Sequence, residues 1–308
     1  MIRYYYKNLR AGQVREQDSY HPGSWVYVES PTEDEIDDLV KRFKLDKGHI
    51  EDALDPDEMP RLEKEGSLTY IFVRYAYANE SRELTTAPLL FIVGSDLLIT
   101  ISTGPIPRLA KYIEGKLDFA TTQRTRLVLL ILDQIVDQYD ILINKIGRQI
   151  GVVRSRLKGK TIGNRDFIDF VMIEDELNEF LAALQPTTAI LRRLLLGRHI
   201  QLYEQDQDLV EDLLLSNEQS IEGCRVHVKS IVNIREAYTT ISSNNLNQTM
   251  KLLTAATVLI TLPNVIFGMY GMNVPLPFQH EPWIFAAIIV VSIVILFGAL
   301  NIIRKRLY

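Results

Sequence analysis

The stretch LLTAATVLITLPNVIFGMY, residues 252–270, is the most informative part of this chain for its architecture. A second apolar run, WIFAAIIVVSIVILFGALNII, follows at residues 283–303. Between Lys251 and Arg304 the only residue with a formal charge is Glu281. A helix of about 20 apolar residues, at about 1.5 Å per residue, spans the ~30 Å hydrocarbon core of a bilayer. Each run is therefore predicted to be a membrane-spanning helix, with a short loop between them.

The charge distribution predicts how the chain sits in the membrane. It contains 34 Lys and Arg and 39 Asp and Glu. From residue 246 onward there are four basic residues, Lys251 and residues 304–306, and one acid, so the part before the spans carries 30 − 38 = −8. This excess of acid argues against a nucleic-acid partner and is compatible with cation binding. Because basic residues flank both spans, the positive-inside rule predicts a multi-pass plasma-membrane protein with both termini cytoplasmic.

Two further features agree with a cytosolic polar domain. The N-terminal residues MIRYYYKN lack the apolar core of a signal peptide, so no cleaved signal is predicted. The single cysteine, Cys224, excludes a disulfide and a cysteine-based metal cluster within one chain.

The first 118 residues have the composition of an α/β domain. Strands are predicted at residues 2–7, 25–29, 68–76, 87–93 and 97–102. The sequence SPTE at residues 30–33 predicts a helix start with Ser30 as the N-cap, followed by helices at residues 34–43 and 46–54. Pro105 and Pro107 are expected to open a turn into a segment at residues 108–116.

From about residue 121 the apolar pattern becomes helical. Residues 124–157 and 165–196 are predicted to form an antiparallel helical hairpin. Residues 201–262 contain one Gly and no Pro, which predicts a stalk helix on the order of 90 Å that continues into the first span. Such a helix requires bundling to be stable in water.

The fold class is therefore an α/β N-terminal cytoplasmic domain, a long helical arm and stalk, and two C-terminal transmembrane helices. The predicted domains are the cytoplasmic α/β domain (1–118), the helical hairpin arm (119–200), the stalk helix with the first span at about 250–270 (201–270), the external loop (271–281), the second span (282–303) and a basic cytoplasmic tail (304–308).

Polar residues form a stripe along the first span. Thr254, Thr257, Thr261 and Asn264 are separated by three or four residues and share one helical face. The stripe extends back to Met250, Asn247 and Ser243 and forward to Gly268. Polar groups in hydrocarbon must face protein or water, so the stripe either lines a pore or packs against other helices. One such face cannot enclose a pore alone, so the pore interpretation requires a homo-oligomer in which the second span faces lipid.

Three segments carry a resemblance to a known family. Tyr270-Gly271-Met272-Asn273 stands between the two spans, NQTMKLLT occupies residues 247–254, and LDPDEMPRLE occupies residues 54–63. Together, in this order, they resemble the CorA-type divalent-cation channels, which are magnesium transporters. The order of α/β domain, helical arm, stalk, two spans and basic tail is also similar to that family over the whole chain.

The resemblance implies a homopentameric funnel that takes up Mg²⁺ and uses no organic cofactor. It implies that Gly271, Met272 and Asn273 form an external selectivity ring for a hydrated ion, which neutral oxygens bind without stripping its water. The pore-lining residues carried over from the family are Asn247, Met250, Leu253, Thr257, Thr261, Asn264, Gly268 and Asn273. Met250 and Leu253 would form a hydrophobic constriction on the cytoplasmic side.

The resemblance also implies that cytosolic Mg²⁺ binds between subunits and closes the channel. The stalk residues Asp208, Glu211 and Asp212 are candidates for this regulatory site, with Glu80 or Glu83 of the N-terminal domain as the partner. A solvated acidic helix face is the alternative interpretation of the same stalk residues.

Some features depart from the family pattern and keep other functions open. The loop after Asn273 is neutral, and its one acid is Glu281 beside His280, a pair that could suit Zn²⁺, Co²⁺ or Ni²⁺. Transport of those ions, with or without proton coupling, is the second hypothesis. The third is a membrane-anchored sensor without transport.

The sequence shows no enzyme signature. It has no phosphate-binding Gly-rich loop and no nucleophile motif, so no enzymatic activity is predicted. The remaining histidines are isolated, without metal-ligand spacing in the sequence: His21, His49, His199 and His227.

Overall fold

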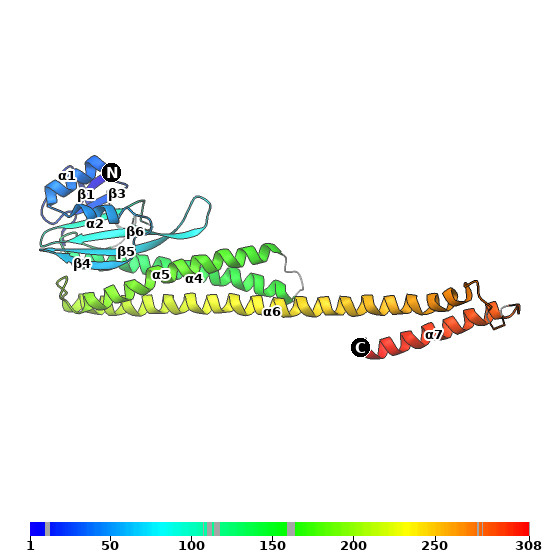
Figure 1. The fold of residues 1–308 in the computed structure, drawn as a ribbon. Helices are drawn as coiled ribbons and strands as arrows, with labels where there is room; N and C mark the ends of the chain where they lie inside the picture. The colour runs from blue at the N-terminus through cyan, green and yellow to red at the C-terminus, as the bar shows by residue number, and fades with distance from the viewer. Residues whose placement is uncertain are drawn as a thin grey trace. The chain divides into compact units, whose positions relative to one another are not determined.

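A computed structural model describes residues 1–9, 13–106, 108–109, 113, 118–158, 164–275, 277–278 and 280–307 of the chain (Figure 1). The segment expected at residues 108–116 lies mostly outside these described residues. The chain divides into two compact units, Met1–Asn233 and Ile234–Tyr308. The first unit thus contains the predicted α/β domain, the helical hairpin and the beginning of the stalk.

A seven-stranded sheet forms the centre of the first unit. Its strands are β1 (Ile2–Tyr6), β2 (Arg15–Gln17), β3 (Trp25–Glu29), β4 (Arg61–Glu65), β5 (Leu68–Ala78), β6 (Leu84–Val93) and β7 (Leu98–Ser102). Their order in the sheet is β2-β1-β3-β7-β6-β5-β4. Neighbouring strands are antiparallel except β3 and β7, which pair in parallel with Trp25 opposite Leu98.

Two short helices, α1 (Glu33–Phe43) and α2 (Lys47–Asp52), cover one face of this sheet (Figure 1). Successive side chains on a strand point to opposite faces, and the buried cluster under these helices contains alternate residues of β3 and β5. Val26 and Val28 of β3 and Tyr70 and Phe72 of β5 pack there with Ile50 of α2. Burial on both faces explains why the central strands are almost continuously apolar.

The opposite face is covered by α4 (Arg124–Lys158) and α5 (Asn164–Leu195) (Figure 1). The Tyr139 hydroxyl of α4 donates a 3.0 Å hydrogen bond to the backbone carbonyl of Arg74 on β5. Glu179 of α5 accepts hydrogen bonds from the Thr85 hydroxyl at 2.8 Å and from the Thr86 amide at 2.6 Å on β6. The helical hairpin therefore packs directly on the sheet.

The last two helices carry the apolar runs. Helix α6 (Glu204–Tyr270) has 67 residues and contains Pro263, and α7 (Ile284–Leu307) has 24. Both have windows long and apolar enough to cross a membrane, and 0% and 6% of the residues in those windows are buried within the chain. Core helices of water-soluble domains bury such surfaces, so here the apolar residues require lipid or neighbouring subunits. The predicted α/β domain, long helix and two C-terminal apolar helices are confirmed.

The start of α1 differs from the prediction. Thr32, not Ser30, is the N-cap: its side chain accepts the Glu35 amide, and the Glu35 carboxylate accepts the Thr32 amide at 2.9 Å. Ser30 has a φ of 43° and donates its hydroxyl to the Thr103 carbonyl at 2.6 Å, so it belongs to the preceding turn. Two short strands, β2 and β4, were not predicted because charged and polar residues dominate both.

The cap assignment predicts the effect of Thr32→Ala. Loss of the capping hydroxyl should destabilise α1 by about 1 kcal/mol, which is roughly a fivefold increase in local opening. Hydrogen exchange at the Glu35 and Ile36 amides of the full-length protein in detergent measures this opening. Thr32→Ser keeps the hydroxyl and is the matched control, and equal exchange in the two variants would contradict the capping role.

Candidate functional site

The threonines of the polar stripe use their hydroxyl hydrogens within α6. Thr254, Thr257 and Thr261 donate to the backbone carbonyls four residues earlier at 2.8, 2.9 and 2.7 Å. A hydroxyl has one donor and two acceptor lone pairs. Each threonine oxygen therefore keeps acceptor capacity for a group outside the helix. A helix face that carries acceptor oxygens can bind cations directly, or can accept hydrogen bonds from the water molecules that hydrate them.

All the residues expected to line a pore are exposed in the single chain. They are Asn247, Met250, Leu253, Thr257, Thr261, Asn264, Gly268 and Asn273. Gly268 shows how open this face is, because a Cβ added there would meet nothing within 4 Å. The spacing along α6 keeps those from Asn247 to Gly268 on one side of the helix, and Asn273 follows the helix end.

The Gly-Met-Asn segment begins where α6 ends. The Gly271 amide donates to the Phe267 carbonyl at 3.0 Å, and the Met272 amide donates to the Met269 carbonyl at 3.3 Å. A Cβ at Gly271 would lie 3.2 Å from the Phe267 oxygen, which is a tight contact. The helix end thus positions Gly271 and Met272 through backbone hydrogen bonds, and Asn273 follows directly as an exposed residue.

A carboxylate on α4, Asp133, lies near the stalk carboxylates of α6. Asp208, Glu211 and Asp212 are all exposed on α6. Burial raises the pKa of Asp133 on α4, and the neighbouring carboxylates of Asp137 and Asp212 raise that pKa further. The Arg108 guanidinium pairs with Asp137 at 3.7 Å and lowers the Asp133 pKa, but the net shift is upward, so a further cation here would be favourable. Asp133 could not be found by sequence reasoning because it lies on a different helix, about 80 residues away from Asp212 in the chain.

The acids of the β5–β6 hairpin have different surroundings. Asn79 donates its side-chain amide to Glu83 at 3.2 Å, and Glu80 is exposed. Burial raises the pKa of Glu176 on α5, which accepts the Leu84 amide at 2.9 Å. A cavity of about 290 Å³ is lined by Asn79, Glu83, Leu84, Thr85, Met172, Asp175, Glu176 and Glu179. Glu83 therefore lines a cavity with carboxylates of α5, whereas Asp212 lies near enough to Asp133 of α4 to affect its pKa.

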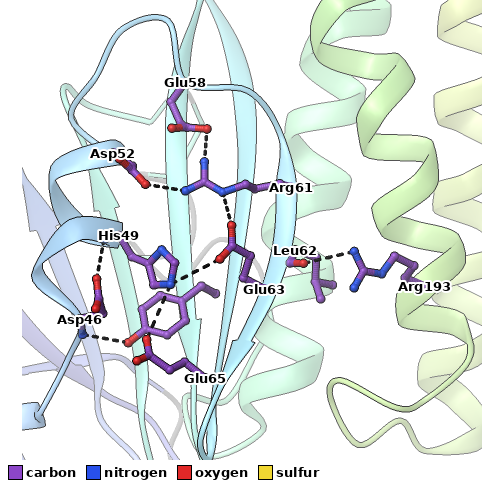
Figure 2. A network of polar contacts seen from close by, with 10 residues as sticks. Asp46, His49, Asp52, Glu58, Arg61, Leu62, Glu63, Glu65 and Arg193 are labelled. Atoms are coloured by element: carbon purple, nitrogen blue, oxygen red, sulfur yellow. Dashed lines mark hydrogen bonds and ion pairs between the residues drawn. The ribbon is translucent and has the colours of Figure 1, made fainter.

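The segment at residues 54–63 is organised by Arg61 (Figure 2). Its guanidinium pairs with Asp52 at 2.6 Å, with Glu63 at 2.5 Å and with Glu58. It also lies 3.8 Å from the ring centre of Phe72, a cation–π contact. These contacts of Arg61 therefore hold the segment against the N-terminal domain.

Arg74 holds the same segment from the sheet. Its guanidinium donates to the Pro56 carbonyl at 2.8 Å, to the Glu58 carbonyl at 2.7 Å and to the Thr86 hydroxyl at 2.7 Å. Backbone carbonyl groups of a loop need hydrogen-bond donors when they are buried away from water. The two arginines together fix the turn between α2 and β4.

The lone cysteine and two histidines have structural positions. Burial raises the pKa of the Cys224 thiol to about 12, so it carries almost no reactive thiolate. Burial lowers the pKa of His227, whose ring packs so closely on α4 that a Cβ at Gly147 would lie 2.7 Å from it. Burial also lowers the pKa of His199.

These observations define an integral membrane protein with an α/β domain, a long helix and a two-span C-terminal unit that presents a face of acceptor oxygens. The family described as "CorA-like Mg2+ transporter protein" matches residues 23–305. The chain belongs to this family. It is accordingly a transporter of the divalent-cation class and no enzyme.

Similar proteins are known from several organisms. The "Cobalt/magnesium transport protein CorA" of Methanocaldococcus jannaschii is 24% identical, over 88% of this chain and 87% of that protein. The "Magnesium transport protein CorA" of Wolinella succinogenes is 24% identical, over 84% and 83%. The complete structure of the Methanocaldococcus jannaschii CorA magnesium transporter matches with a TM-score of 0.88 at 22% identity and covers 99% of this chain and 98% of that one.

The Arg61 network predicts a clear loss of stability on substitution. Arg61→Ala leaves three carboxylates without their shared cation and should destabilise the first unit by about 2 kcal/mol. For a unit of this size the melting temperature should fall by about 5 °C. Thermal unfolding of the full-length protein in detergent measures the shift. Arg148→Ala, at an exposed position on α4, is the matched control; an equal melting temperature for the two variants would show that the network contributes nothing.

Proposed function

We propose that this chain forms a homopentameric channel for Mg²⁺ uptake. One observation carries the proposal: an exposed face of α6 presents acceptor oxygens through the depth of the apolar segment and leads to the exposed residues Gly271–Asn273. A single helix cannot enclose a pathway, so several copies must surround it. The fold match to a complete CorA structure and the membership of the family support this assembly.

The chemistry of this face suits a hydrated ion. Mg²⁺ loses its water reluctantly, so a neutral ring can select it by accepting hydrogen bonds from its water shell. The hydroxyl oxygens of Thr257 and Thr261 can act as such acceptors, because their hydrogens are already donated to backbone carbonyls of α6. Neutral groups bind weakly enough to release the ion, which conduction requires. Met250 and Leu253 carry apolar side chains at the cytoplasmic end and would close the pathway by excluding water.

The membrane potential supplies the driving force in this proposal. A divalent ion that crosses 100 mV gains about 4.6 kcal/mol, since each charge contributes about 2.3. No nucleotide is needed. Both termini would be cytoplasmic and residues 271–281 external, in the plasma membrane, because the basic residues lie at Lys251 and at residues 304–306.

Asn273→Ala tests the selectivity ring. Removing the amide should reduce Mg²⁺ uptake by about tenfold, the consequence of losing about 1.4 kcal/mol of ion stabilisation. Uptake into liposomes with a Mg²⁺-sensitive dye measures the rate under an imposed negative-inside potential. The control is Asn301→Ala, which removes the same group from the exposed end of α7. Unchanged uptake by the Asn273 variant would rule out the proposed ring.

The number of subunits is an independent test of the proposal. Native mass spectrometry of the protein in detergent should show five copies. A monomer or dimer cannot line the pathway and would favour a membrane-anchored sensor instead.

We also infer that cytosolic Mg²⁺ closes the channel through the stalk carboxylates. Burial and the carboxylates of Asp137 and Asp212 raise the pKa of Asp133 more than the Arg108 guanidinium lowers it, so a further cation at this place would relieve repulsion between carboxylates. Asp208 and Glu211 are exposed on the same part of α6 and add to the negative charge. Glu80 and Glu83 are the proposed partners from the α/β domain of a neighbouring subunit.

Asp212→Lys should therefore weaken closure. The internal Mg²⁺ concentration needed for half-maximal closure should rise at least about fivefold, because site couplings of this kind are typically worth 1–3 kcal/mol. Uptake rates in liposomes preloaded with graded Mg²⁺ measure it. Asp169→Lys makes the same charge change at an exposed position of α5. If both variants close like the unmodified protein, the stalk carboxylates have no regulatory role.

A second candidate function keeps the fold and changes the ion to Co²⁺, Zn²⁺ or Ni²⁺, with or without proton coupling. The external loop supports it, because Glu281 is its only acid and stands beside His280, and imidazole favours these metals over Mg²⁺. One relative is also named for both cobalt and magnesium transport. Competition uptake separates the two functions, since flux that excess Mg²⁺ does not reduce would favour the transition metals.

A further inference from the structure

The fold brings His49 into a group of carboxylates that are distant in the sequence (Figure 2). Its Nε2 atom lies 3.6 Å from a carboxylate oxygen of Glu63 and 3.7 Å from one of Glu65. One ligand atom each from Asp46, His49 and Glu65 lie within 4.8 Å of one another. His49 and Asp46 come from the start of α2, and the glutamates come from the edge strand β4.

The sheet positions these groups. Glu63 and Glu65 are two residues apart on β4, so both side chains project toward the face covered by α2. Lys64, the residue between them, projects from the opposite face. The His49 ring packs on Tyr70 with 4.3 Å between ring centres, and its side chain is 16% exposed. The imidazole is therefore held by packing, while its Nε2 atom faces the glutamates.

Arg61 orients one of these carboxylates. One oxygen of Glu63 accepts the Arg61 Nε hydrogen at 2.5 Å, and the other oxygen faces His49. The backbone is fixed as well, because Asp46 accepts the His49 amide at 3.1 Å. Supporting hydrogen bonds of this kind orient ligands around a metal ion and strengthen its binding.

The local charge is strongly negative. The carboxylates around Arg61 and His49 are Asp46, Asp52, Glu58, Glu63 and Glu65. With one guanidinium and a neutral imidazole, five carboxylates leave a formal charge of −4. The nearby Lys47 pairs with Asp37 at 2.9 Å. A divalent cation would therefore be attracted to this group.

The distances around His49 fit a metal site better than direct hydrogen bonding. At 3.6 and 3.7 Å the Nε2–carboxylate separations exceed ordinary hydrogen-bond lengths. Ligand atoms about 2.0–2.1 Å from a tetrahedral metal are separated from each other by about 3.4 Å. Small side-chain rotations of the exposed Glu65 and Asp46 would bring them to such positions.

We propose that His49, Glu63 and Glu65, with Asp46 as a further ligand, bind a divalent transition-metal ion of the Zn²⁺ or Co²⁺ type on the α/β domain. Imidazole combined with carboxylates selects these ions, whereas Mg²⁺ prefers oxygen ligands alone. The site is separate from the pore and from the stalk carboxylates. It does not depend on the proposed Mg²⁺ uptake, and a bound ion would link α2 to the edge of the sheet.

Titration of the full-length protein in detergent with Zn²⁺, in the presence of excess Mg²⁺, tests the site. We expect one Zn²⁺ per chain by calorimetry, and Co²⁺ should give visible absorption bands from a nitrogen- and oxygen-ligated ion. Glu65→Gln, at an exposed position on the edge strand, should weaken binding at least about tenfold, and His49→Gln should abolish it. His21→Gln, which changes an exposed histidine outside the group, should bind like the unmodified protein.

Hydrogen exchange separates loss of the ligand from loss of the fold. At a Zn²⁺ concentration close to the dissociation constant of the unmodified protein, exchange in α2 and β4 should slow in that protein and in the His21 variant, and clearly less in the Glu65 variant. The proposal is overturned if the unmodified protein binds no Zn²⁺ under excess Mg²⁺. It is equally overturned if Glu65→Gln, with exchange in β5 and β6 as in the unmodified protein, binds Zn²⁺ with full affinity.

Discussion

The need to satisfy every polar group inside a hydrocarbon layer governs the C-terminal unit. Backbone groups meet it by forming helices, and α6 and α7 are helical through their apolar runs. The side chains meet it in the same way, since Thr254, Thr257 and Thr261 each donate to a carbonyl one turn earlier. This arrangement consumes the donors and leaves acceptors on a single face. The hydrogen bonds that satisfy the threonine hydroxyls thus also leave a surface of acceptor oxygens for hydrated cations.

The soluble part uses carboxylates in three different ways. Around Arg61 they are neutralised by a shared guanidinium and hold the turn between α2 and β4. Around Asp133 the Arg108 guanidinium compensates only in part, and burial with the carboxylates of Asp137 and Asp212 still raises the pKa of Asp133. Around His49 they adjoin an imidazole at metal-site distances. The first arrangement is structural, whereas the other two make the domain receptive to cations.

Much of this organisation could be predicted from local sequence. Two long apolar runs specify membrane helices by length alone, and the central strands are recognisable from their β-branched and aromatic content. The edge strand β4 was not predicted because its sequence RLEKE is mostly charged. It is a strand because its backbone pairs with β5. The N-cap of α1 is Thr32 and not the predicted Ser30, because Ser30 lies in a turn with a positive φ. No residue type in this turn indicates that φ value.

Local sequence is enough to identify the class of protein, since membrane spans, the polar stripe and the Gly271–Asn273 segment are each contiguous or periodic in the chain. Which distant side chains come together depends on the tertiary structure. His49 is isolated in the sequence, yet the α2–β4 packing places it beside Glu63 and Glu65. Asp212 of α6 likewise acts electrostatically on Asp133 of α4, although the two are far apart in the sequence. Periodicity reports which face a residue occupies, but contact between elements depends on how the whole core packs.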